Sequence, residues 1–219
     1  MVAEITDYSA FYEALEAMDK PRCVQLARQF LESGVHDIAG LYANILAPAL
    51  NTMTDSESGQ PAAIWREHVR SGIVRTVIEC CYPFVLAERD ASQIAADKGK
   101  VVIVSPTDEF HELGARMGCD FFILQGYEAI YVGANTPKAE LLQGLTLERP
   151  AYVVINAVNF YNLFKIQKIV AEIKERLPGQ RILASGNAFY HDPELFRRIG
   201  ALAVIRTPDD IRKLEEERS

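Results

Sequence analysis

Apolar residues between residue 9 and about residue 90 recur at spacings of three and four, the pattern of amphipathic helices. In the first such segment, Phe11, Leu15 and Met18 share one face. Proline at the start of a segment and glycine after its end mark helix limits, whereas Pro48 lies inside a segment and predicts a kink. The pattern predicts a small four-helix bundle, with helices over 9–19, 21–34, 36–53 and about 62–89.

From Lys100 the pattern changes to short apolar runs that alternate with amphipathic segments. Strict alternation of strand and helix predicts a parallel sheet with helices on both faces and right-handed crossovers. The fold class is therefore α/β, a flavodoxin-like or Rossmann-like five-stranded sheet that follows the N-terminal bundle. We expect a bundle domain over 1–98 and an α/β domain over 99–219, with strands near 101–105, 129–134, 151–158, 181–186 and 203–206.

Composition narrows the class of protein. With 219 residues, 49% of them hydrophobic and 24% charged, the chain can bury a substantial core, and no apolar run is long enough for a membrane span. The N-terminus lacks the pattern of a signal peptide, which predicts a cytoplasmic protein with reduced cysteines. A net charge of −7 argues against direct nucleic-acid binding, because phosphate contacts need clustered Lys and Arg.

Ligands of an open parallel sheet bind outside the carboxyl ends of its strands. The loops that follow the first four strands are therefore the candidate site. They contain no GxGxxG after the first strand, and the chain has neither a GxxxxGK[ST] loop nor a GxSxG elbow, which disfavours nicotinamide, ATP and hydrolase chemistry. The four loops span 105–114, 133–137, 156–162 and 184–189.

The first loop contains His111, two residues after Glu109. In one interpretation His111 is a metal ligand, and Glu109 accepts a hydrogen bond from its second ring nitrogen and fixes the tautomer. In the other, the loop is an ordinary helix start, with Thr107 or Asp108 as the N-cap and Glu112 in the first turn. Spacing alone leaves both interpretations open.

The same loop resembles a motif of cobalamin-binding domains, D-x-H-x-x-G, with glutamate at the first place as in the sensor branch of that family. Further along, the segment 126–137 is similar to the second strand and loop of these domains. Bundle and sheet in this order resemble light-sensing adenosylcobalamin regulators and methionine-synthase-like corrinoid proteins. The matching motif positions are Glu109, Phe110, His111 and Gly114, then Asn156 and Val158 at S-x-L, and Ser185 and Gly186 at G-G.

The resemblance implies that the cofactor is cobalamin, as adenosylcobalamin or methylcobalamin. It implies that His111 is the lower axial ligand of the cobalt, in place of the cofactor's own base. The nucleotide tail would then pass Gly114, Asn156 and Ser185. Glycine at position 114 would leave room for that tail.

The fourth predicted helix contains Trp65, the only tryptophan, close to Glu67 and His68. Trp65 and His68 are three positions apart and so share a helix face, and Gly72 lies one turn further on. In the light-sensing regulators the bundle supplies a tryptophan and a Glu-His pair above the cobalt, which implies the same role for Trp65, Glu67 and His68. The alternative is that Trp65 packs in the bundle core.

The leading hypothesis is a cobalamin-binding sensor or regulator that responds to light or ligand through a partner transcription regulator, as an antirepressor-like protein and not as an enzyme. The second is a corrinoid carrier subunit that serves a partner methyltransferase. The third is a degenerate domain that binds another tetrapyrrole or nothing. A homo-oligomer is compatible with each.

Overall fold

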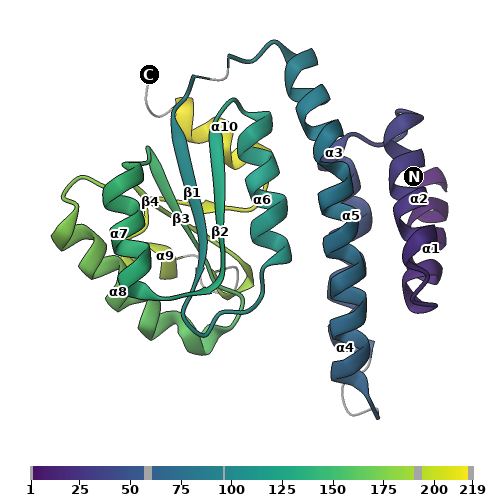
Figure 1. Ribbon diagram of the computed structural model, residues 1–219, viewed down its shortest axis with the longest axis horizontal. Helices are drawn as coiled ribbons and strands as arrows, with labels where there is room; N and C mark the ends of the chain where they lie inside the picture. Colours follow the sequence, from purple (N-terminus) through teal and green to yellow (C-terminus); the bar gives the residue numbers. More distant parts are fainter. Residues whose placement is uncertain (1, 57–60, 96, 190–193, 217–219) are drawn as a thin grey trace. The chain divides into compact units, whose positions relative to one another are not determined.

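The structure is a computed structural model that describes residues 2–56, 61–95, 97–189 and 194–216. The chain divides into two compact units, Met1–Ala91 and Ser92–Ser219, which are described separately (Figure 1). No helix in the described part of the chain is both long enough and apolar enough to cross a membrane.

The N-terminal unit is helical, as predicted. Asp19 begins the second helix by accepting a hydrogen bond from the backbone N–H of Arg22 at 3.0 Å, and Met18 just before it has a φ of 55°, which ends the first helix. Buried apolar side chains from these helices include Phe11, Leu15, Leu26, Phe30, Leu41, Ile45, Val74 and Val77. The helices are α1 (Val2–Glu16), α2 (Lys20–Glu32), α3 (Ile38–Leu41), α4 (Ala47–Ser56) and α5 (Ala63–Ser92).

A π-helical turn, Tyr42–Leu46, joins α3 directly to α4 and lies just before Pro48. Its wider ring is closed by a hydrogen bond from the N–H of Ala47 to the carbonyl of Tyr42, five residues back. Proline has no N–H to donate and its ring clashes with the preceding turn, so a local widening lets the helix continue through it. Pro48 therefore modifies the helix without ending it, as the sequence predicted.

The C-terminal unit is a five-stranded parallel sheet with the strand order β2-β1-β3-β4-β5 (Figure 1). This order is the flavodoxin-like one, in which the chain reverses direction across the sheet beside β1. The strands are β1 (Lys100–Pro106), β2 (Glu128–Thr136), β3 (Tyr152–Asn156), β4 (Ile182–Ser185) and β5 (Val204–Ile205). The helices are α6 (Leu113–Leu124), α7 (Lys138–Glu148), α8 (Leu163–Arg176), α9 (Leu195–Ile199) and α10 (Pro208–Glu216).

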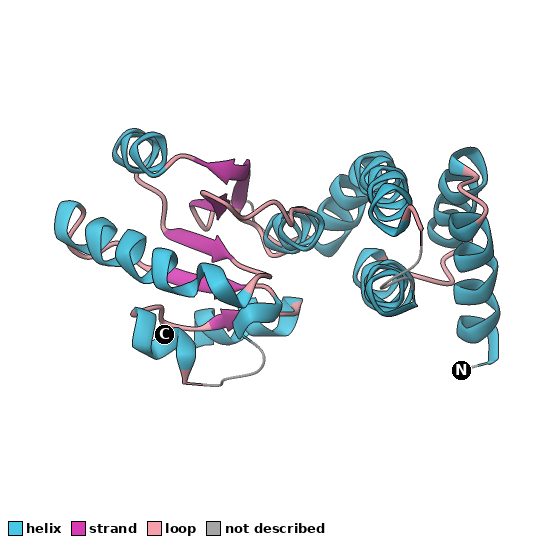
Figure 2. Ribbon diagram, turned by 90° about the horizontal axis from the view of Figure 1, so that it is seen from below, coloured by secondary structure: helices cyan, strands magenta, loops and turns pink. Residues whose placement is uncertain are grey.

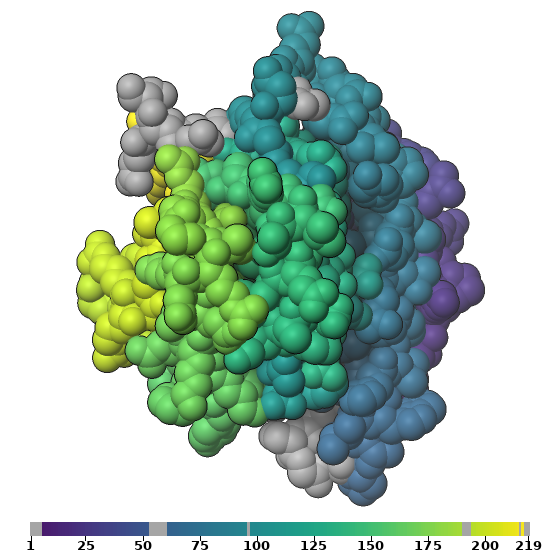
Figure 3. Space-filling model, turned by 60° about the vertical axis from the view of Figure 1, so that its left-hand side comes forward, coloured from purple at the N-terminus to yellow at the C-terminus, as the bar shows by residue number. Residues whose placement is uncertain are grey.

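Helices cover both sides of this sheet (Figure 2). Alternate residues of a strand face opposite sides, so Val102, Val153 and Ile182 pack with the apolar faces of α7, α8 and α9. On the other side α6 packs on β1 and β2 and also contacts α10. Figure 3 shows one face of this unit in space-filling form, coloured from green to yellow. The predicted fold class is confirmed.

The edge strand β2 pairs with β1 in an irregular register. The pairing shifts between Ile103 and Val104 and again between Val104 and Pro106. Gly133, opposite Val104, has a φ of 127°, a backbone conformation that favours glycine. These irregularities bring the end of β2, at Asn135 and Thr136, against the loop that follows β1.

Candidate functional site

The site lies at the carboxyl edge of the sheet, where the loops after β1 and β3 meet at one carboxylate. Glu109 is fully buried, and its Oε1 accepts a hydrogen bond from the ring Nδ1 of His111 at 2.6 Å and from the His111 backbone N–H at 3.1 Å. Its Oε2 accepts the backbone N–H groups of Val158 and Asn159, both at 3.0 Å, and the side-chain amide of Asn162 at 3.3 Å. Five donors therefore hold one carboxylate.

This enclosure determines the charge of Glu109. Burial on its own would raise the pKa, but the hydrogen bonds from the His111 ring and from the backbone N–H groups of Asn159, Val158 and His111 favour the charged form. Their combined effect lowers the pKa to about 2. The carboxylate is thus ionised at neutral pH, and it holds the imidazole in the tautomer with the proton on Nδ1 and a lone pair on Nε2.

The His111 side chain is 55% exposed although its partner is buried. The Glu109 contact is the one that the metal-ligand interpretation of the loop requires. The helix-start interpretation is wrong in its caps, because α6 begins only at Leu113, with Glu112 as an N-cap that makes no side-chain capping bond. Thr107 and Asp108 instead bond to Thr136 and Asn135 at the end of β2.

A second hydrogen-bonded group supports the main chain of His111. The side-chain amide of Asn156 donates to the His111 carbonyl and to the hydroxyl of Ser105, both at 2.9 Å, and Ser105 also donates to that carbonyl at 3.2 Å. The hydroxyl of Ser185, at the end of β4, donates to the side-chain oxygen Oδ1 of Asn156 at 3.3 Å. Polar side chains from β1, β3 and β4 thus converge below the loop that carries His111.

The two glycines at motif positions, Gly114 and Gly186, have different surroundings. At Gly186 a Cβ would lie 2.2 Å from the carbonyl oxygen of Ala157 and 2.9 Å from Oδ1 of Asn156, and φ is 97°. Gly186 is therefore required by the close approach of two loops, a reason that the sequence did not reveal. At Gly114 no atom lies within 4 Å of the Cβ position, so the space that a nucleotide tail would need is open there.

Large aromatic side chains are exposed in the loops that surround His111. Phe110 is 66% exposed, and after β3 the 3₁₀ turn Phe160–Asn162 and the start of α8 expose three more rings. Clustered exposed apolar side chains at a site are typical of surfaces that bind a large ligand or a partner. The three further rings belong to Phe160, Tyr161 and Phe164.

Trp65, Glu67 and His68 lie in the first two turns of α5, in the N-terminal unit. Trp65 is 61% exposed, so the alternative that it packs in the bundle core is wrong. Glu67 is half-buried and His68 is exposed. The role of these three residues above a cobalt stays a prediction.

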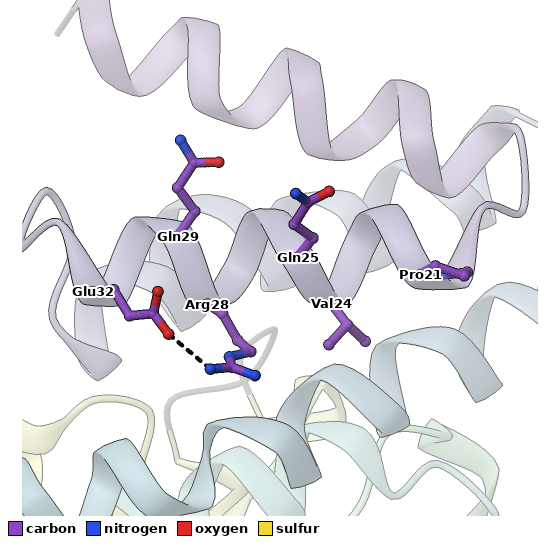
Figure 4. A pocket seen from close by; sticks show the side chains of 6 residues that line it. All are labelled: Pro21, Val24, Gln25, Arg28, Gln29 and Glu32. Atoms are coloured by element: carbon purple, nitrogen blue, oxygen red, sulfur yellow. Dashed lines mark hydrogen bonds and ion pairs between the residues drawn. The ribbon is translucent and has the colours of Figure 1, made fainter.

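The N-terminal unit also has a shallow hollow along α2 (Figure 4). Its lining includes an exposed ion pair between Arg28 and Glu32 at 2.9 Å. Polar side chains predominate in it, and it shares no residue with the predicted site. The lining residues are Pro21, Val24, Gln25, Arg28, Gln29 and Glu32.

Sequence reasoning missed three side chains of the site, Ser105, Asn135 and Asn162. Asn162 bonds to Glu109 from 53 positions away, and Asn135 bonds to Asp108 from 27 positions away. Such contacts depend on the strand order and not on local spacing. The available signal was compositional, because three asparagines lie between residues 156 and 162, at the carboxyl end of a predicted strand.

Comparison with known proteins identifies one family and several proteins with a similar fold. The family model described as B12 binding domain matches residues 99–213. The fold is similar to that of the monomethylamine corrinoid protein of Methanosarcina barkeri, at 12% identity and a TM-score of 0.77, over 98% of this chain and 99% of that one. No curated protein sequence matches the chain.

Two further solved structures share the fold. One is a cobalamin-binding protein from Desulfitobacterium hafniense DCB-2, with 14% identity and a TM-score of 0.51 over 97% of this chain and 98% of that one. The other is the methanol:cobalamin methyltransferase complex of Methanosarcina barkeri, with 15% identity and a TM-score of 0.50 over 97% and 79%. With more than half of its length matched by the family model, the chain belongs to the B12 binding domain family, and its cofactor is cobalamin.

Proposed function

We propose that this protein is a corrinoid methyl carrier that holds cobalamin through His111 and presents it to partner methyltransferases. Two of the proteins with a similar fold support this proposal, one a monomethylamine corrinoid protein and the other a methanol:cobalamin methyltransferase complex. In this proposal residues 99–219 bind the cofactor and residues 1–98 form the cap. The carrier hypothesis replaces the sensor as the leading one.

The observation that carries the proposal is the pair of Glu109 and His111. A cobalt ligand must offer a neutral imidazole nitrogen, and a 2.6 Å hydrogen bond from Nδ1 to a buried carboxylate keeps the proton away from Nε2. The imidazole is at the same time 55% exposed at the edge of the sheet. The residues present therefore fit a cobalamin whose lower ligand comes from the protein.

Each residue that contacts His111 has a separate role in this proposal. Bound cobalamin supplies a cobalt atom that accepts a methyl group from one substrate and releases it to another. Glu109 holds the proton on Nδ1 and raises the basicity of the ring. Asn156 and Ser105 fix the main chain of His111, because both donate to its carbonyl oxygen.

The nucleotide tail of the cofactor is proposed to enter beside Gly114, where the Cβ position has no neighbouring atoms. Asn156 and Ser185 lie on adjacent strands and are joined by a 3.3 Å hydrogen bond, so the tail would meet them together. Phe110 lies in the loop after β1 and Val158 in the loop after β3. Gly186 allows the loops after β3 and β4 to approach each other closely. This path uses the motif positions that resemble the family.

Nitrogen-isotope labelling tests the lower ligand directly. Hydroxocobalamin is bound to the protein and reduced to the paramagnetic Co(II) form, and its electron paramagnetic resonance spectrum is recorded with natural and with ¹⁵N-labelled protein. A nitrogen ligand from the protein changes its splitting from a triplet to a doublet on labelling, whereas the cofactor's own base does not. We expect the doublet for the wild type and its loss in His111→Ala.

His68→Ala is the matched control, since it removes another exposed histidine and should leave the doublet unchanged. A triplet that persists in the labelled wild-type protein would exclude His111 as the ligand. Transfer of a methyl group to the bound cobalamin by a methyltransferase and a methyl donor then tests the carrier role. A protein that is never methylated but changes its oligomeric state in light would instead be a sensor.

The sensor remains the second candidate because of Trp65. A tryptophan that is 61% exposed in the first turn of a long helix is available to a ligand, which buried Trp would not be. In that hypothesis Glu67 and His68 contact the upper group of adenosylcobalamin. The partner would then be a transcription regulator.

A further inference from the structure

The loop that carries His111 is attached to the end of β2 by three hydrogen bonds. The backbone N–H of Asn135 donates to the carbonyl of Glu109 at 2.8 Å, and the Asn135 side-chain oxygen accepts the backbone N–H of Asp108 at 2.9 Å. The hydroxyl of Thr107 donates to the carbonyl of Thr136 at 3.1 Å. Asn135 thus contacts the two residues that precede Phe110 through both its main chain and its side chain.

These contacts stabilise a turn whose third residue has a left-handed backbone conformation. The turn over 106–109 is closed by a hydrogen bond from the N–H of Glu109 to the carbonyl of Pro106 at 2.9 Å, and its third residue, Asp108, has a φ of 67°. A positive φ at that place favours glycine or asparagine. Asp108 is held there by Asn135 at its N–H and by Asn162 at its carbonyl, at 3.1 Å.

Asn135 is itself in the left-handed region, with a φ of 51°. Asparagine adopts this conformation more readily than other residues that carry a Cβ, apart from aspartate. The position therefore requires two properties together, tolerance of a positive φ and a short side chain that ends in a hydrogen-bond acceptor. Asparagine and aspartate have both, glycine has only the first, and alanine has neither.

We propose that the side chain of Asn135 is a positioning group for His111, acting through the main chain of Asp108 and Glu109. The inference rests on the proposed role of His111 as the cobalt ligand. The carboxylate of Glu109 is held by Val158, Asn159 and Asn162, whereas its main chain depends on the turn over 106–109. The side-chain oxygen of Asn135 holds the N–H of Asp108 in that turn, so the carboxylate and the imidazole that it binds meet in one geometry.

The test compares Asn135→Gly with Asn135→Asp in the full-length protein. Both variants keep the backbone N–H and tolerate the positive φ, so they differ in the acceptor for Asp108. Binding of hydroxocobalamin is measured by absorption titration, and the ¹⁵N doublet of the Co(II) form gives the fraction with histidine bound. We expect Asn135→Asp to match the wild type and Asn135→Gly to bind about 10-fold more weakly, with a smaller histidine-bound fraction, the effect usual for a residue that orients a metal ligand.

Arg149→Ala is the control for a general effect on folding. Arg149 also has a positive φ, 45°, and is the C-cap of α7, the helix that follows β2, so its replacement perturbs a left-handed residue away from the site. We expect it to leave affinity and doublet unchanged. Equal affinities and equal doublets in Asn135→Gly and Asn135→Asp would overturn the positioning role while leaving His111 as the ligand. If the ¹⁵N doublet is lost only in His111→Ala, His111 is confirmed as the ligand whatever the result for Asn135. If the wild-type protein itself shows no ¹⁵N doublet, the proposed function is refuted.

Discussion

Glu109 combines full burial with full ionisation, which a side chain can do only when its partners replace the water it has lost. Its five donors come from its own loop and from the loop after β3. Hydrogen bonds to a charged acceptor are roughly twice as strong as neutral ones. Because these donors belong to separate segments, the charged form of Glu109 stabilises the folded arrangement of both segments at the edge of the sheet.

Glu109 should therefore make the stability of the C-terminal unit depend on acid. Its pKa falls from 4.5 to about 2 on folding, so it stabilises the native state above pH 4.5, and that contribution is lost as the pH falls toward 2. A shift of this size corresponds to at most about 3 kcal/mol. We expect Glu109→Gln to lower the stability at pH 7 and to flatten the dependence between pH 5 and 2, measured by hydrogen exchange of the β1 and β3 amides.

Glu112 provides the matched control for that measurement. It lies three residues further along, at the start of α6, so Glu112→Gln removes the same charge without entering the Glu109 cluster. Its acid profile should follow the wild type. A Glu109→Gln profile as steep as the wild-type one would show that other carboxylates cause the acid dependence.

At the scale of elements, the alternation of apolar runs from Lys100 onward was sufficient to predict all five strands and the helices between them. The first and last residues of each helix and strand were harder to predict, because hydrogen bonds determine where an element begins and ends. Thr107 and Asp108 look like helix caps in sequence, yet they bond to the end of β2, and α6 starts later. The π-helical turn before Pro48 was also missed, since a one-residue widening leaves the apolar spacing almost unchanged.

The helix α5 allows a test of Trp65. Because its side chain is largely exposed, Trp65→Phe should change the free energy of unfolding by less than about 0.5 kcal/mol. Under the carrier proposal the ratio of affinities for adenosylcobalamin and hydroxocobalamin should also stay the same. A selective loss of adenosylcobalamin affinity would favour the sensor. Urea unfolding and dark absorption titrations measure the two quantities.

Ile73→Ala on the same helix is the comparison for the unfolding measurement. Ile73 is buried, so its truncation should cost about 2 to 5 kcal/mol through the cavity that it leaves. If Trp65→Phe destabilised the protein to a comparable extent, the exposed placement of Trp65 would be contradicted.

At the scale of the whole molecule, the motif residues of the first, third and fourth loops converge because parallel strands end at one edge. The resemblance supplied His111, Asn156 and Ser185, and the strand order explains why they meet. Asn162 and Asn135 could not be foreseen, since their partners are distant in sequence and asparagine is common in any loop. Three of the five donors to Glu109, from Val158, Asn159 and Asn162, are therefore a property of the fold and not of the first-loop motif.

The C-terminal unit has its own buried core, so a protein consisting of residues 92–219 should fold alone. Because the residues of the proposed lower site all lie within it, it should bind hydroxocobalamin and show the ¹⁵N doublet. Circular dichroism and the spectrum of the reduced complex check both points. His111→Ala in the same shortened protein should abolish the doublet. A shortened protein that folds but shows no doublet would mean that the N-terminal unit helps to form the lower site.

The irregular edge strand β2 has a consequence for aggregation. A regular edge strand presents a row of backbone groups to which another chain can add as a new strand, and native proteins commonly prevent this with bulges and local twists. The two register shifts between β1 and β2, together with the positive φ of Gly133, interrupt such a row in the second half of the strand. The irregularity that brings Asn135 to the His111 loop therefore also disfavours strand addition along that edge.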